Sequence, residues 1–314
     1  MRNYIKIALL FIVLCCGFKS NTNAQQLPFY CHYFVNPMLY NPAMTGYGYQ
    51  SGVFLQHRSQ YGSDYAGAPK TNVASFETTI KKRTIGLGGV IFNDKAGLVD
   101  KTGAYFNYAY KLQIDKNNRF LFGVSGGLYS SKLNFTDAVY IDPNDPLILT
   151  SSQSAIVPDA SIGAYYIYKK AEVGISFPQV LGAKGSYNEP AKNSSIKNAR
   201  NFYATLEYNF TIVKAKQIKF MPLLLIRGNS GKVQYDFNGI FSHPKLGWAG
   251  LTYKTNYAVG LSVGAHVNNL LIGYHYEIPT SSIAKNMGIN HEILLGLKFG
   301  KKEVIKKTVP RSKY

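Results

Sequence analysis

The residues best suited to chemistry in this sequence are two histidine–glutamate combinations near its C-terminal end. His291 and Glu292 are adjacent, but the second histidine of a zinc-protease motif is missing and the pair falls on an expected strand. His275 and Glu277 alternate with apolar residues, so both should point into the protein interior. There we expect them to join a polar network with Glu207, Asp236 and Lys298. Neither combination predicts a metal centre.

Other catalytic motifs lack their structural context. The glycine-rich stretch 86–89 is followed by neither a helix nor the Gly-Lys-Ser/Thr of a phosphate-binding loop, so we interpret it as strand glycine that lets aromatic rings pack. No Gly-x-Ser-x-Gly motif stands at a strand-to-helix elbow, where a nucleophilic serine would be exposed. We therefore expect a protein that is not an enzyme and that has no cofactor and no metal.

Residues 1–24 have the pattern of a secretory signal peptide. Basic residues precede an apolar stretch at 7–17, and Ala24 offers a small-residue cleavage site, so the mature chain should begin at Gln25. Cleavage removes two of the three cysteines and leaves Cys31 alone. The mature protein can then form no intramolecular disulfide, and we interpret Cys31 as a small apolar residue.

The charge balance is strongly basic, with 35 Lys+Arg against 16 Asp+Glu and a formal net charge of +19. An exported protein seldom meets nucleic acid, and much of the excess lies in short turns and in the tail 301–314. This distribution indicates contact with anionic lipid, peptidoglycan or an acidic protein. The tail is either a docking segment or a solvated extension. We expect no nucleic-acid partner and no small-molecule substrate.

Alternation of apolar and polar residues, typical of strands, recurs along the chain. In 256–267, Val259, Leu261 and Val263 alternate with small or polar residues, and 232–241 shows the same two faces. One face suits lipid and the other a crowded or wet interior. We expect large inward-facing residues to fill part of that interior, among them Phe106, Tyr203 and His275.

These patterns predict about fourteen strands, an even number, as bacterial barrels require. They are placed near 50–59, 69–79, 84–93, 102–112, 119–131, 158–168, 171–178, 202–213, 217–227, 232–241, 245–253, 256–267, 270–278 and 290–300. Connections after even-numbered strands are short, whereas the longest, 132–157, 179–201 and 279–289, follow odd-numbered strands. An all-β transmembrane antiparallel barrel with short periplasmic turns, long extracellular loops and both termini in the periplasm requires this parity. If the chain were instead a soluble β-sandwich, the placing of every long connection after an odd-numbered strand would be a coincidence.

Two Asn-Pro steps, at 36–37 and 41–42, make the region before the first strand rigid and non-extended. It could be a periplasmic plug or docking segment at the barrel mouth, or simply a packed leader into the first strand. The stretch Gly67-Ala68-Pro69-Lys70 has the composition of a tight turn, which accounts for it without a role in surface contact.

A series of short motifs runs through nearly the whole mature chain. It begins with Asn36, Pro37, Tyr40, Asn41 and Pro42, continues with Arg58, Gly67, Pro69, Lys70 and Asp94, and ends with Trp248, Tyr274, His291 and Glu292. As an ordered set, these motifs resemble the PorP/SprF family of Bacteroidetes outer-membrane proteins, which is associated with type IX secretion and gliding. These residues are our candidates for family motifs and partner docking. Where the family often has Gly-Tyr-Ser-Tyr-Asp, this chain has His275 and Glu277.

The resemblance implies an outer-membrane barrel that anchors or assists export of large surface proteins, such as adhesins, that carry a type IX signal domain. Its other implied partners are periplasmic secretion and gliding components and the membrane lipid. The expected organisation is a signal peptide at 1–24, a periplasmic N-terminal segment or plug at 25–48, a barrel at 49–300 and a basic periplasmic tail at 301–314. The alternatives are a porin-like channel for small solutes and a passive structural barrel or adhesin.

Overall fold

The computed structural model describes residues 28–48, 50–62, 67–134, 152–187, 195–198, 200–213, 215, 217–229, 232–282 and 287–300. The expected signal peptide and C-terminal tail lie outside the described residues, as does most of the connection 132–157. Within the described ranges, no helix is long and apolar enough to cross a membrane.

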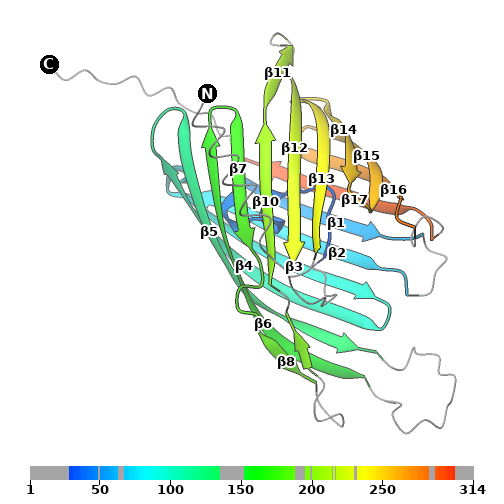
Figure 1. Ribbon diagram of the computed structural model, residues 1–314. Coiled ribbons are helices and arrows are strands. Elements are labelled where there is room, and N and C mark those ends of the chain that lie inside the picture. The colour runs from blue at the N-terminus through cyan, green and yellow to red at the C-terminus, as the bar shows by residue number, and fades with distance from the viewer. Residues whose placement is uncertain are drawn as a thin grey trace, which may run out of the picture.

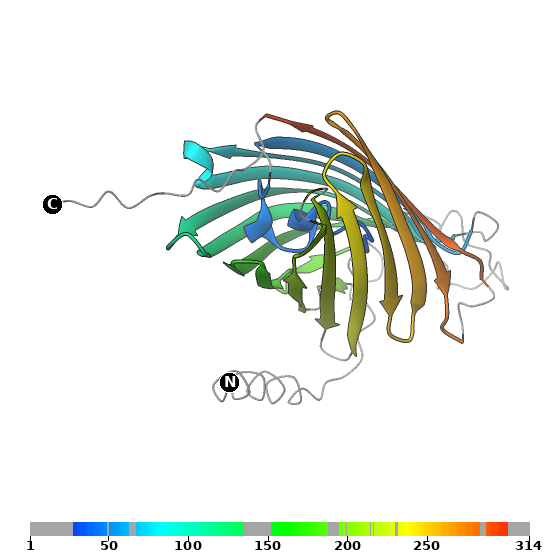
Figure 2. The ribbon, with the colours of Figure 1, turned by 90° about the horizontal axis from the view of Figure 1, so that it is seen from above.

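The described chain forms a closed antiparallel barrel, which confirms the predicted fold (Figures 1 and 2). Strand β1 (Ser51–Ser59) pairs with the last strand, β17 (Asn290–Phe299), and so closes the wall. β10 (Asn201–Tyr208) and β11 (Phe210–Val213) are consecutive pieces that both pair with β12, so the 15 strands of the sheet make fourteen wall positions.

The remaining wall strands follow in sequence order, and each pairs with its neighbours in the chain. They are β2 (Lys70–Ile80), β3 (Ile85–Ala96), β4 (Val99–Gln113), β5 (Asn118–Leu133), β6 (Gln153–Tyr168), β7 (Ala171–Phe177), β12 (Ile218–Asn229), β13 (Lys232–His243), β14 (Gly247–Lys254), β15 (Ala258–Val267) and β16 (Leu270–Pro279). A separate two-stranded hairpin, β8 (Lys184–Ser186) and β9 (Ser195–Lys197), stands in the connection between β7 and β10.

The two ends of the barrel differ in their connections. At one end, which we call the turn end, every connection between wall strands is short, for example 81–84 after β2 and 169–170 after β6. At the other, the loop end, lie the three longest connections, at 134–152, 178–200 and 280–289. The strand parity predicted from the sequence is therefore confirmed.

The wall has an apolar outer face and an inner face that mixes polar and apolar side chains, in keeping with the crowded interior that the alternation predicted. In β1, Val53 and Leu55 are exposed, whereas Gln56 and Arg58 are buried inside. The prediction that Phe106 fills the interior was wrong, because this residue is 59% exposed on the outer face. Other large outward residues include Phe76, Ile91, Tyr108, Tyr110, Tyr208, Tyr235, Leu251 and Tyr253.

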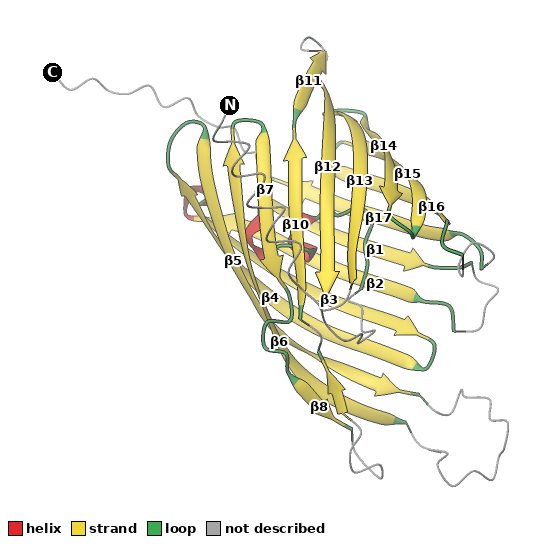
Figure 3. Ribbon diagram, in the orientation of Figure 1, coloured by secondary structure: helices red, strands yellow, loops and turns green. Residues whose placement is uncertain are grey.

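Residues 28–48, which we call the lumen segment, lie inside the barrel (Figures 2 and 3). The segment contains two short 3-10 helices, η1 (Pro37–Leu39) and η2 (Pro42–Met44), each opened by one of the two Asn-Pro steps. Proline suits this position because the first N–H groups of a helix have no partner within the helix. The Asn41 side chain accepts a hydrogen bond from the Ala43 N–H and so caps η2.

The lumen segment runs the length of the barrel. Near its start, the Phe29 ring lies 5.3 Å from that of Tyr257, in the loop-end turn between β14 and β15. Near its finish, Gly46 contacts Glu77 and Lys111 close to the turn end. The described chain thus enters the barrel at the loop end, whereas β17 finishes at the turn end. Because the termini lie outside the described residues, their common periplasmic location stays a prediction.

Strand glycines make room for the lumen segment. A Cβ atom built on Gly123 would lie 2.2 Å from the Ala43 nitrogen, and one on Gly163 would lie 2.0 Å from the Asn41 side-chain oxygen. Gly86 in β3 faces the Thr45 carbonyl in the same way, at 2.0 Å. The interpretation of 86–89 as glycine that admits aromatic rings therefore needs correction, because Gly86 admits the backbone of the lumen segment.

The close approach at Gly123 yields a prediction. In Gly123→Val, the new side chain should displace the lumen segment and expose Cys31, which is buried in the wild-type protein. In protein prepared without residues 1–24, which include the other two cysteines, maleimide labelling of Cys31 should speed up at least about ten-fold. Gly126→Val is the matched control. Gly126 lies on the same strand as Gly123, but no other atom lies within 4 Å of the position that its Cβ atom would take. Equal labelling rates in both variants would contradict the packing described here.

Candidate functional site

Glu292, on β17, binds the start of the lumen segment. Its carboxylate accepts hydrogen bonds from the backbone N–H groups of Cys31, at 2.6 Å, and His32, at 3.0 Å. The His32 Nδ1 atom lies 2.8 Å from the same carboxylate. These three contacts fix the backbone of the lumen segment against the wall.

Glu277, on β16, stands at the centre of an ion-pair cluster that consists of Arg58, Lys254, Glu277 and Glu292. The Arg58 guanidinium lies 2.6 Å from the Glu277 carboxylate and 3.8 Å from that of Glu292. Lys254 forms an ion pair with the other Glu277 oxygen. All four side chains are almost fully buried, so two positive and two negative charges offset one another away from bulk solvent.

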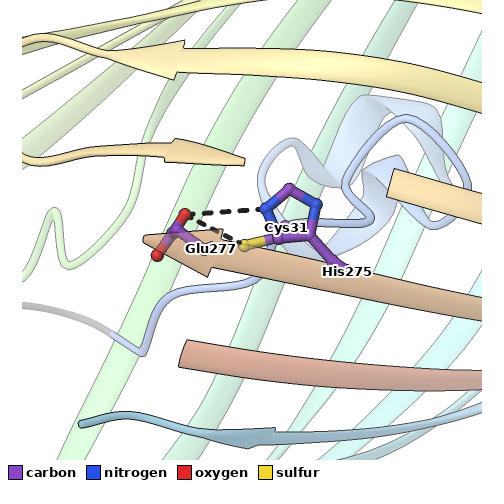
Figure 4. A group of neighbouring side chains, drawn as sticks. All are labelled: Cys31, His275 and Glu277. Carbon is purple, nitrogen blue, oxygen red and sulfur yellow. Dashed lines mark hydrogen bonds and ion pairs between the residues drawn. The ribbon is translucent and has the colours of Figure 1, made fainter. Parts of the chain in front are cut away.

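The same region brings three possible metal ligands together (Figure 4). The ligand atoms of Cys31, His275 and Glu277 lie within 4.8 Å of one another, and neither His275 nitrogen has a hydrogen-bond partner among the described residues. However, Arg58 donates to the Cys31 sulfur at 2.7 Å, and Lys254 contacts both the sulfur and Glu277. The donor set therefore fits an ion-pair cluster better than a metal.

Uncharged contacts hold the middle of the lumen segment. The Asn36 side chain donates to Ser75 at 2.9 Å, and the Ser176 hydroxyl donates to the Tyr40 carbonyl at 2.6 Å. The Asn41 side chain donates to the carbonyl of Ala164 in β6 at 3.1 Å. Both Asn-Pro motifs are thus bound to the inner wall.

A second anchor lies toward the turn end. The Glu77 carboxylate accepts a hydrogen bond from the Gly46 N–H at 2.7 Å, and Lys111 donates to the Gly46 carbonyl. The Tyr47 hydroxyl donates to Glu172 at 3.3 Å. Charged wall residues therefore hold the lumen segment near both of its ends.

Apolar packing supplements these polar contacts. Each of the three buried hydrophobic clusters combines lumen-segment residues with wall residues. Trp248, a predicted docking residue, belongs to one of them, and its ring lies 6.1 Å from His32 and 6.0 Å from Phe34.

The structure divides the predicted candidates into three groups. Inside the barrel lie Asn36, Pro37, Tyr40, Asn41, Pro42, Arg58, Trp248 and Glu292. At the loop end lie Gly67, Pro69, Lys70 and Asp94, where Gly97 donates its N–H to Gly67 and Thr71 donates to Asp94. On the outer face, the Tyr274 hydroxyl lies 2.6 Å from the His291 Nδ1 atom. The candidates do not form one continuous surface.

The predicted network around His275 and Glu277 has different members from those expected. Both residues point inward, as predicted, but Glu277 pairs with Arg58 and Lys254. Asp236 instead pairs with Arg227 at 2.8 Å, and Glu207 accepts from Asn209 at 2.9 Å.

Sequence reasoning missed the roles of Cys31, His32 and Lys254. Lys254 is the last residue of β14 and lies one residue beyond the predicted end of that strand. Extending the alternation by one residue would have placed the Lys254 side chain inside the barrel. Cys31 and His32 lie outside any periodic element, and no comparable signal was present for them.

A closed wall with an apolar outer face, buried charged and polar groups inside it and loops of unequal length defines an outer-membrane β-barrel. The CymD monoaromatic hydrocarbon channel shares this fold, with 12% sequence identity, a TM-score of 0.54 and coverage of 85% of this chain and 93% of that chain. Two further structures are more distant in shape. The KdgM porin has 10% identity and a TM-score of 0.38, with coverage of 79% of this chain and 99% of that chain. A Pseudomonas aeruginosa FadL homologue has 9% identity and a TM-score of 0.46, with coverage of 83% of this chain and 93% of that chain.

The family model of the type IX secretion system membrane protein PorP/SprF matches residues 22–297. The chain therefore belongs to the PorP/SprF family, as the motifs in its sequence suggested. Among curated proteins, none matches the sequence significantly.

The ion-pair cluster yields a stability prediction. Glu277→Gln would leave Arg58 and Lys254 buried with one carboxylate between them, so the free energy of unfolding should fall by about 3–5 kcal/mol. Denaturant unfolding in detergent micelles measures this, with exposed Lys70→Gln as a control expected to change it by less than about 0.5 kcal/mol. Adding Lys254→Met to Glu277→Gln restores the charge balance and should recover part of the loss. A Glu277→Gln protein as stable as the wild type would contradict this role.

Proposed function

We propose that this barrel is a non-enzymatic element of type IX secretion that anchors or assists export of a large surface protein. In this proposal the loop end faces outward and engages the exported protein, and the turn end contacts periplasmic secretion or gliding components. The lumen segment carries the proposal: because the chain's own residues occupy the lumen along its length, the useful surfaces are the two ends.

Charge at the turn end supports an acidic periplasmic partner. Lys81, Lys116, Lys169 and Lys170 are exposed in three separate turns, with Asp115 as a nearby acidic residue. Clustered cations steer and orient an acidic surface toward this end.

Loop size supports engagement of a client at the opposite end. The connections 134–152 and 178–200 are the longest in the barrel, and the second contains the β8–β9 hairpin. The hairpin region contacts the inner wall through the Ser131 and Tyr187 hydroxyls, 3.3 Å apart. Loops on a rigid scaffold are the usual carriers of binding residues.

No catalytic arrangement competes with this proposal in the described residues. The Gly-x-Ser-x-Gly stretches around Ser125 and Ser262 lie within β5 and β15, away from any strand-to-helix elbow. The alternative, a porin-like channel for small solutes, draws support from the channel fold of the structural neighbours. The lumen segment argues against it, because a channel needs an open passage.

The proposal is tested by mild-detergent co-purification from the native envelope with two variants. Replacing 135–151 by a short Gly-Ser linker leaves β5 and β6 intact and should remove the exported surface protein while keeping the periplasmic components. Exchanging Lys81, Lys116, Lys169 and Lys170 for Gln should do the reverse. Wild-type protein that purifies with neither class of partner would contradict the proposal.

A further inference from the structure

A small cavity lies between the lumen segment and the inner wall of β3, β4, β6 and β10. Its volume is about 100 Å³, well above the roughly 10–15 Å³ that one water needs. Five of its fifteen lining residues are aromatic, and the centroids of the Tyr40 and Tyr203 rings lie 4.9 Å apart. The lining residues that matter here are Tyr30, Tyr40, Phe92, Tyr105, Asp159 and Tyr203.

Asp159 is the acidic residue of this cavity, and it is only 4% exposed. It accepts hydrogen bonds from the Tyr105 hydroxyl at 3.0 Å and from the Ala160 N–H at 2.8 Å. Within the described part of the chain, no Lys, Arg or His lies within ion-pair distance of it. By contrast, Arg58 and Lys254 pair with Glu277, elsewhere in the lumen.

A buried carboxylate without a cation is costly, because hydrogen bonds from neutral groups replace only part of its lost hydration. The faces of tyrosine and phenylalanine rings attract cations, most strongly where water is excluded. A cation in this cavity would therefore meet both an unpaired negative charge and aromatic faces.

We propose that the cavity binds an alkylammonium or guanidinium group beside Asp159. This group could come from the lysine or arginine side chain of a bound polypeptide or from a small free amine or guanidine. The inference does not depend on the function proposed above, since it rests on the lining residues alone.

The test is calorimetric titration of the purified, processed protein in detergent micelles with ethylguanidinium chloride. N-ethylurea serves as a neutral probe of nearly the same shape. Ethylguanidinium should bind saturably at one site, at least ten-fold more tightly than N-ethylurea. Absence of saturable ethylguanidinium binding, or equal affinity for the two probes, would overturn the proposal.

Variants separate the carboxylate from the rest of the lumen. Asp159→Asn should weaken ethylguanidinium binding at least ten-fold and leave N-ethylurea unaffected, whereas Asp100→Asn, near the β3–β4 turn, should change neither. Retention of folded mobility on unheated gels shows that each variant still forms the barrel. Unchanged ethylguanidinium binding by folded Asp159→Asn would refute the assignment.

A peptide probe identifies the source of the cation. If acetyl-Ala-Arg-Ala-amide binds more tightly than ethylguanidinium and loses affinity in Asp159→Asn, the ligand group belongs to a polypeptide. If only the small cation binds, and does so through Asp159, the site takes a free amine or guanidine.

Discussion

The structure depends on how the interior of a closed fourteen-strand wall is filled. Closure satisfies the backbone hydrogen bonds that lipid cannot, but it also encloses more space than the inward side chains occupy. The lumen segment takes up that space, and charged contacts hold it near both ends, through Glu292 and Glu77. These carboxylates accept hydrogen bonds from backbone N–H groups. They therefore hold the backbone of the lumen segment in place without depending on its side chains.

Much of the wall could be predicted from the sequence, because one lipid-facing side imposes a period of two residues. That argument fails where both faces are aromatic. In β4, Tyr105 points inward beside Asp159, and its neighbour Phe106 points outward. Residue type cannot tell which of two neighbouring aromatic residues points inward, and the face assigned to Phe106 was therefore wrong.

The candidate site was predictable only in part, because its contacts join residues far apart in the chain. The inward direction of His275 and Glu277 followed from alternation, but the partners of Glu277 depend on barrel closure, which brings β1 within two strands of β16, and on where the lumen segment runs. Glu277 pairs with Arg58, 219 residues away, and Glu292 binds Cys31, 261 residues away. An irregular segment held by such contacts leaves no periodic signal in the sequence.

We propose that residues 28–48, which lie in the lumen, close the barrel to solutes and leave its two ends for binding. Single-channel recording of the purified protein in planar bilayers tests this claim most directly, with a variant that lacks 28–46 as the reference. We expect no stable open steps for the wild type and steady conductance for the variant. Stable steps of the same size in both proteins would contradict it.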